Sequence, residues 1–120
     1  MEEVELVQNG SKLMASSAKV GQILQEQESA GRLIAAICAA PIALKSHGIA
    51  KNNKVTSHPC VKKEMEDGGY HYSEERVVHD GSVVTSRGPG TAHEFGVKLV
   101  EILKGKDKAE EVKKPMILNF

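Results

Sequence analysis

The alternation of apolar and polar positions along the chain predicts helices and strands that follow one another in turn. Apolar residues recur at helical spacing from Ser11 onward, and Gly31 is suited to end that helix. The next run, residues 33–37, holds five apolar residues and no charge, which predicts a buried strand of a parallel sheet. Residues 1–10 show no clear pattern, and Asn9-Gly10 is typical of a turn.

The second half of the chain continues this alternation and adds a hairpin. Asp80-Gly81 lies between the apolar segments 76–79 and 82–85, and this dipeptide suits a type I′ turn. The whole pattern predicts an α/β layer architecture with a mainly parallel sheet plus one hairpin. The other expected elements are a helix over about 40–47, a strand over 54–57, a helix over 61–67, extended backbone over 70–72, a helix after the loop 87–91 that ends at Gly105, a polar helix over 107–113 and a strand over 116–118.

Composition narrows the class of protein. The chain has 120 residues, enough for one domain with one core, and its 16 basic and 16 acidic side chains cancel, so we expect no nucleic-acid surface. No apolar run is long enough for a membrane span. The acidic start, residues 1–5, argues against a signal or transit peptide, which leaves the cytoplasm as the expected compartment, with the nucleus or mitochondrion as alternatives. Two cysteines make no disulfide framework, and neither their spacing nor the five scattered histidines match a metal site.

Cys38 is the first candidate for chemistry. It directly follows the expected strand 33–37, and Pro41 fits the first turn of the helix that comes next. A strand, a tight corner bearing a cysteine and a helix form the geometry of a nucleophile elbow. The helix N-terminus is expected to lower the pKa of the thiol and favour the thiolate. The alternative is a small cysteine buried in the core, which is common for this residue type.

His58 and a glycine-rich loop are the second and third candidates. His58 ends the strand 54–57, so Cys38 and His58 reach the same sheet edge if their two strands are parallel neighbours. A Cys–His pair supports nucleophilic addition to a carbonyl, with the histidine as proton shuttle. The alternative is a loop histidine at a strand end. Gly88-Pro89-Gly90 precedes a helix and suits either a pocket wall or anion site, or a plain turn.

The chain offers two further observations near these candidates. Cys60 follows His58 by two residues, which fits a resolving or oxidation-prone thiol and also fits the simpler case of an exposed loop cysteine without a role. A carboxylate beside Cys38 would complete the mechanism, and no motif in the sequence places one there.

Four motifs follow one another at a characteristic spacing. They are Ala35-Ala36-Ile37-Cys38-Ala39-Ala40-Pro41, Val55-Thr56-Ser57-His58-Pro59, Gly68-Gly69-Tyr70, and Thr85-Ser86-Arg87-Gly88-Pro89-Gly90-Thr91 with Glu94-Phe95. Together they resemble the parkinsonism-associated protein deglycase family of the ThiJ/PfpI superfamily, most closely its animal cytosolic branch. The resemblance covers about residues 10–120 of a single domain 1–120, in which residues 1–9 diverge.

The resemblance implies a fold and a function. The fold is a flavodoxin-like three-layer α/β sandwich, usually as a homodimer. The function is a cofactor-independent glyoxalase or protein deglycase, in which a cysteine adds to methylglyoxal or early glycation adducts and is also oxidised under stress. Cys38 carries over as nucleophile and oxidation-sensitive residue, and His58 as its nearby histidine. Ala39, Gly88, Pro89 and Gly90 carry over as pocket-forming residues, with no metal, nucleic acid or membrane involved.

One departure from the family pattern changes these expectations. Family chains place two further βα units before this region, including the first strand and the glutamate that hydrogen-bonds the cysteine. We therefore expect a fold lacking the first βα units, a weakened dimer and weak or no activity. The alternatives are a non-catalytic, redox-responsive binding or chaperone fragment and, less favoured, a Cys–His hydrolase such as a peptidase.

Overall fold

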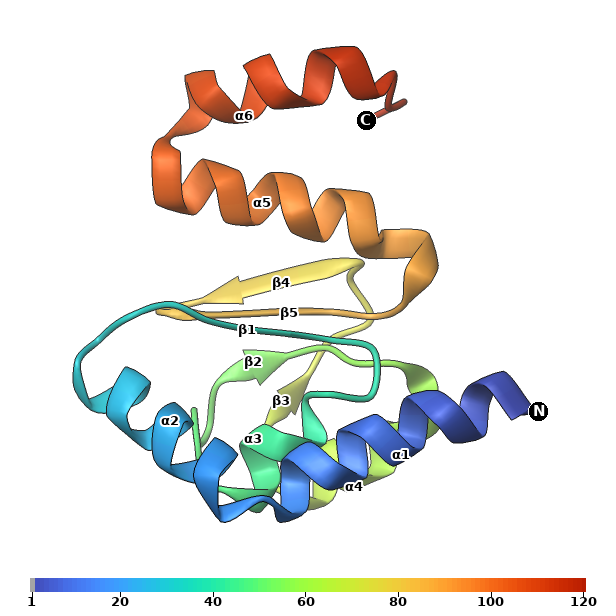
Figure 1. Cartoon of the computed structure of the whole chain (residues 1–120), viewed down its shortest axis with the longest axis vertical. Coiled ribbons are helices and arrows are strands. Elements are labelled where there is room, and N and C mark those ends of the chain that lie inside the picture. Colours follow the sequence, from blue (N-terminus) through green and yellow to red (C-terminus); the bar gives the residue numbers. More distant parts are fainter. Residues whose placement is uncertain (1) are drawn as a thin grey trace.

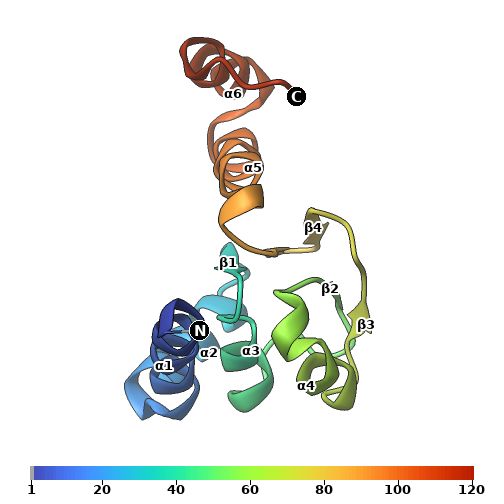
Figure 2. The ribbon, with the colours of Figure 1, turned by 90° about the vertical axis from the view of Figure 1, so that its right-hand side faces the viewer.

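The computed structural model describes residues 2–120 and arranges helices on both sides of the strands (Figure 1). On one side lie α5 and α6, and a view turned by 90° shows α5 between α6 and the strands (Figure 2). On the other side lie α1, α2, α3 and α4. This confirms the predicted α/β layers. The helix bounds are Glu2–Ser16 for α1, Ala18–Ser29 for α2, Ile42–Ser46 for α3, Lys62–Asp67 for α4, Ala92–Lys104 for α5 and Lys106–Lys113 for α6.

The strands form a three-stranded sheet and a separate pair. In the first sheet, β1 (Ile34–Ile37) runs parallel to β5 (Val83–Ser86), and β4 (Val77–Asp80) runs antiparallel to β5. The pair consists of β2 (Lys54–Val55) and β3 (His71–Tyr72), which are parallel. Mainly parallel pairing with one hairpin is therefore confirmed. Direct pairing of the strands before Cys38 and His58, the condition for both residues to reach one sheet edge, is not met, because β1 pairs with β5 and β2 with β3.

Three local expectations about strands need correction. The hairpin turn is Gly81-Ser82, one residue later than predicted, because Asp80 still pairs with Val83 and Gly81 takes the positive φ of 62°. The buried strand is β5, whose four residues are all buried, whereas Ala35 of β1 is exposed. Residues 116–118 form no strand, since a 3-10 turn covers Lys114–Met116 and Ile117 is 90 % exposed.

The N-terminal part is more helical than expected. Asn9-Gly10 lies inside α1 and is not a turn. The helix predicted from Ser11 breaks at Ser17, whose hydroxyl accepts the backbone N–H of Val20 at 3.3 Å and so caps α2. Helix α1 is held against the body of the protein, since the His47 ring Nε2–H donates to the Met14 carbonyl at 2.9 Å.

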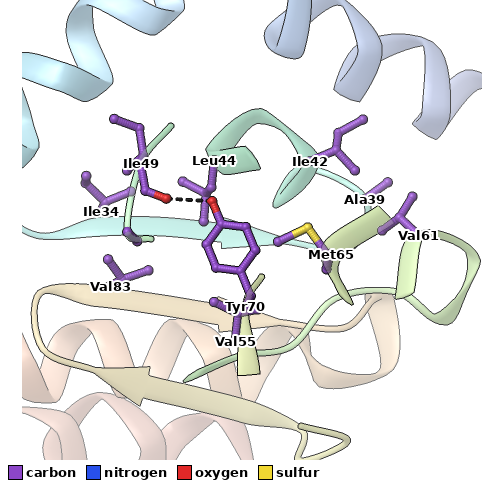
Figure 3. Packing of buried hydrophobic residues seen from close by; sticks show 11 residues of the cluster. Ile34, Ala39, Ile42, Leu44, Ile49, Val55, Val61, Met65, Tyr70 and Val83 are labelled. Atoms are coloured by element: carbon purple, nitrogen blue, oxygen red, sulfur yellow. Dashed lines mark hydrogen bonds between the residues drawn. The ribbon is translucent and has the colours of Figure 1, made fainter. Parts of the chain in front are cut away.

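The hydrophobic core lies between the strands and helices α3 and α4 (Figure 3). It gathers side chains from β1, β2 and β5 with those of the helices and of the chain between them. Its members are Ile34, Ala39, Ile42, Leu44, Ile49, Ala50, Val55, Val61, Met65, Tyr70 and Val83. The core thus supports the turn that follows β1, because Ala39 within that turn is completely buried.

Tyr70 brings a polar group into this core. Its hydroxyl donates to the carbonyl oxygen of Ile49 at 2.6 Å, the dashed contact of Figure 3. Burial, assisted by the negative charge of Glu28, raises the pKa of Tyr70 to about 12. The folded state therefore holds the phenolic proton more tightly than the unfolded state, whose tyrosine titrates near pH 10.

Tyr70→Phe should destabilise the fold by about 1–3 kcal/mol, because the buried Ile49 carbonyl loses its donor. The wild type should also lose stability as pH rises from about 10 to 12, since only the unfolded state releases the proton in that window. Urea unfolding at pH 7 and across this window measures both effects. Tyr70→Phe should lack the part of this loss of stability that comes from the Tyr70 proton. An identical pH dependence of stability in the two proteins would contradict this account.

Candidate active site

The backbone of Cys38 is held on two sides in the turn between β1 and α3. Its N–H donates to the Ser86 carbonyl at 3.0 Å, which extends the β1–β5 pairing by one residue. Its carbonyl accepts the N–H of His58 at 2.7 Å. Cys38 has a φ of 66°, in the left-handed region that costs a non-glycine residue about 1–3 kcal/mol. Such strain is concentrated at functional sites, and the contacts to Ser86 and His58 keep Cys38 in this conformation.

The environment of the thiol acts on its pKa in opposing directions. Burial raises the pKa of Cys38, the backbone N–H of Ala39 lowers it by hydrogen bonding the sulfur, and the charge of Cys60 raises it again. The net shift is upward, so the expected lowering by a helix N-terminus is wrong. The physical reason is that α3 begins only at Ile42 and has five residues, while the sulfur itself is half-buried.

Ala39 serves this site through its backbone. Its side chain is completely buried in the core, and Figure 3 shows it at the end of the cluster that holds Val61 and Met65. Its N–H faces the sulfur of Cys38. A residue of this size permits the close approach of the turn to the core, and the role of Ala39 as a pocket residue stays a prediction.

His58 lies beside Cys38 although their strands do not pair. It caps the 3-10 turn Pro59–Val61, and its Nδ1 accepts the backbone N–H of Cys60 at 3.1 Å. In the neutral ring, an accepting Nδ1 places the proton on Nε2, which is then available to donate. The hydrogen bond from the Cys60 N–H therefore orients the half-buried His58 ring. It occupies Nδ1 and does not involve Nε2.

The Gly88-Pro89-Gly90 loop lies on the other side of the histidine ring. A Cβ atom added to Gly88 would meet His58 Cδ2 at 3.7 Å, an ordinary van der Waals contact. Gly88 is buried, whereas Pro89 and Gly90 are exposed. The Thr91 hydroxyl accepts the Gly88 N–H at 3.1 Å and donates to the Gly88 carbonyl at 3.0 Å, which holds the loop closed. The structure thus brings Gly88 to His58 and leaves Pro89 and Gly90 at the surface.

Arg87 connects the loop to the His58 segment, and the sequence analysis did not place it in the site. Its Nε–H donates to the Ser57 carbonyl at 3.0 Å, directly before His58. Its guanidinium also donates to the Glu74 carbonyl at 3.4 Å. The only sequence signal is its position next to Gly88 at the end of β5, and backbone carbonyls as partners leave no motif. Arg87 acts as a positioning residue, because it holds the backbone that presents His58.

Within residues 2–120, a carboxylate near the thiol or a metal-binding group of side chains would extend the chemistry of the site. The groups that shift the pKa of Cys38 there include no carboxylate. The described residues contain no group of three or more His, Cys, Asp or Glu side chains that could hold a metal ion. Within the same part of the chain, no helix has the length and apolar character needed to cross a membrane. The site consists of a thiol, an imidazole and backbone N–H groups.

Comparison with known proteins identifies the family of the chain. The sequence profile of the DJ-1/PfpI family matches residues 8–102, and the chain belongs to this family. It is 50% identical over 110 residues to the Parkinson disease protein 7 homolog of Danio rerio, with 91% of this chain and 58% of that protein covered. It is 44% identical over 109 residues to the glutathione-independent glyoxalase DJR-1.2 of Caenorhabditis elegans, with 91% and 58% covered.

The fold agrees with solved structures of the family. The crystal structure of Drosophila melanogaster DJ-1beta superposes with a TM-score of 0.90 at 47% identity, over 93% of this chain and 60% of that one. The structure of Schizosaccharomyces pombe DJ-1 gives 0.83 at 36% identity, over 90% and 57%. The flavodoxin-like assignment is thereby confirmed. The chain spans about three fifths of the length of these relatives.

Proposed function

We propose that this chain carries a cysteine centre that converts small reactive carbonyls without a cofactor, as a glutathione-independent glyoxalase or protein deglycase. The observation that carries the proposal is the 2.7 Å hydrogen bond from the His58 N–H to the Cys38 carbonyl. It holds a strained cysteine and an oriented imidazole side by side, in segments that follow strands of two different sheets. The Caenorhabditis elegans relative, which is a glutathione-independent glyoxalase, supports the same substrate class.

The chemistry can be written for methylglyoxal. The Cys38 thiolate adds to the aldehyde carbon, a carbon–sulfur bond forms, and the carbonyl oxygen takes a proton from Nε2 of His58. A proton then leaves this carbon to His58 and returns to the neighbouring one, which gives the thioester of lactate. Water releases lactate and restores the thiol, so the sum is methylglyoxal plus water to lactate and a proton. Early glycation adducts would enter through the same addition step.

Three further properties belong to the proposal. Cys38 is its oxidation-sensitive residue, because a half-buried thiol next to solvent can be reached by peroxide. The chain acts in the cytoplasm, and its assembly is a homodimer weaker than the one that the family resemblance implies. Ala39 and Gly88 shape the pocket, through a backbone N–H at the sulfur and through contact with the His58 ring. Pro89 and Gly90 border the pocket from the surface.

Lactate release in the absence of glutathione tests the function. Wild type and Cys60→Ala should both convert methylglyoxal to lactate, with a rate that rises with pH because the thiol pKa is raised. In Cys60→Ala the remaining cysteine is Cys38. After alkylation with iodoacetamide, this variant should form no lactate. Equal lactate after alkylation would contradict the proposal. No turnover together with concentration-dependent association would favour the redox-responsive binding or chaperone fragment instead.

A further inference from the structure

Both cysteines of the chain form a backbone hydrogen bond with His58. The N–H of His58 donates to the Cys38 carbonyl at 2.7 Å, so the chain returns to Cys38 at His58. Two residues later the N–H of Cys60 donates to His58 Nδ1 at 3.1 Å. His58 therefore contacts Cys38 through its backbone and Cys60 through its ring.

The surroundings of the two thiols differ in a way that suits a division of roles. Cys38 is half-buried within the turn after β1, whereas Cys60 is exposed on the 3-10 turn Pro59–Val61. The charge of Cys60 raises the pKa of Cys38, so the two sulfurs lie within electrostatic reach of each other. A thiol that is accessible and close to an oxidisable cysteine has the position of a resolving cysteine.

We propose that Cys60 is the resolving thiol of Cys38, so that oxidation by peroxide ends in a reversible Cys38–Cys60 disulfide. In the first step the Cys38 thiol is oxidised to sulfenic acid by hydrogen peroxide, which is reduced to water. In the second step the Cys60 thiolate attacks the Cys38 sulfur, the sulfur–sulfur bond forms, and hydroxide leaves and takes the proton released by Cys60 to give water. Two equivalents of a thiol reductant return both thiols.

The disulfide would switch the site off and protect it. A disulfide needs Cα atoms within about 7 Å of each other, and the exposed position of Cys60 on its 3-10 turn leaves its side chain accessible for the bond. The disulfide removes the Cys38 nucleophile of the proposed carbonyl chemistry. Its role as an off-switch therefore rests on the proposed function. Disulfide formation also consumes the sulfenic acid before a second peroxide can convert it to sulfinic acid, which a thiol reductant cannot reverse.

Intact-mass spectrometry after treatment with hydrogen peroxide tests this inference without an activity readout. Wild type should lose the mass of two hydrogens as a monomer, peptide mapping should join Cys38 to Cys60, and dithiothreitol should restore the original mass. The matched variant Cys60→Ser, changed at an exposed position, should instead gain two oxygens on Cys38 that dithiothreitol does not remove.

The other outcomes separate this inference from the function. Gain of two oxygens on Cys38 in wild type, as in Cys60→Ser, would overturn the resolving role, and so would a disulfide that joins two copies of the chain. An intramolecular disulfide in a protein that forms no lactate would leave this inference standing and remove the carbonyl function. Lactate formation without the disulfide would overturn the resolving role of Cys60 and leave the carbonyl function standing.

Discussion

Replacing Cys38 by alanine should reduce lactate formation from methylglyoxal to the rate measured without protein. The reason is that the thiol is the covalent nucleophile, and its removal leaves only binding and proton transfer by His58. Alanine keeps the Cβ atom, and the two backbone contacts to Ser86 and His58 do not involve the side chain. Steady-state assays of lactate at a fixed pH measure the effect.

Cys60→Ala is the matched control for this substitution. It removes the same atoms two residues from His58, and the exposed side chain of Cys60 has no part in the proposed carbonyl chemistry. Its rate should stay close to that of wild type, and the urea unfolding midpoints of all three proteins should be similar. A Cys38→Ala protein that keeps full turnover would exclude Cys38 as the nucleophile.

Leu44→Ala should destabilise the fold by about 2–5 kcal/mol, the range for a large-to-small change in a packed core. Leu44 lies on the short helix α3, is 1 % exposed and packs in the main cluster (Figure 3). The substitution removes buried apolar area and leaves a cavity beside the turn that carries Cys38. Urea unfolding at pH 7 measures the loss.

Leu103→Ala makes the same chemical change at a position of α5 that is 64 % exposed. Its effect should remain within about 0.5 kcal/mol, as for most surface substitutions. If the two leucine variants lost equal stability, the cluster around α3 would not be the centre of the fold.

The Cys38 turn could be predicted because its signals are local. A short uncharged apolar run, a cysteine, small residues and Pro41 define a strand, a corner and a helix without knowledge of the rest of the chain. His58 was expected at the end of a strand 54–57, whereas β2 ends at Val55 and His58 caps the 3-10 turn that follows. The pattern brought the two residues together only if their strands were parallel neighbours. Strands β1 and β2 pair with other partners, and a loop hydrogen bond joins Cys38 and His58 instead.

Features that depend on tertiary contacts were not predictable. Helix α1 is held by hydrogen bonds from the side chains of Ser46 and His47 to the carbonyls of Ala15 and Met14, and no periodicity announces them. The upward shift in the thiol pKa depends on how deeply the turn is buried, which the pattern of residue types does not contain. The position of Arg87 at the site could not be predicted, because it binds backbone carbonyls, which any residue type supplies.

A carbon-13 spectrum of the protein mixed with methylglyoxal labelled at the aldehyde carbon tests most directly that Cys38 is a carbonyl-binding nucleophile. The wild type and Cys60→Ala should show the signal of a carbon bonded to the Cys38 sulfur, followed by labelled lactate, and Cys38→Ala should show neither. The same sulfur-bound signal and the same lactate in Cys38→Ala would contradict the account.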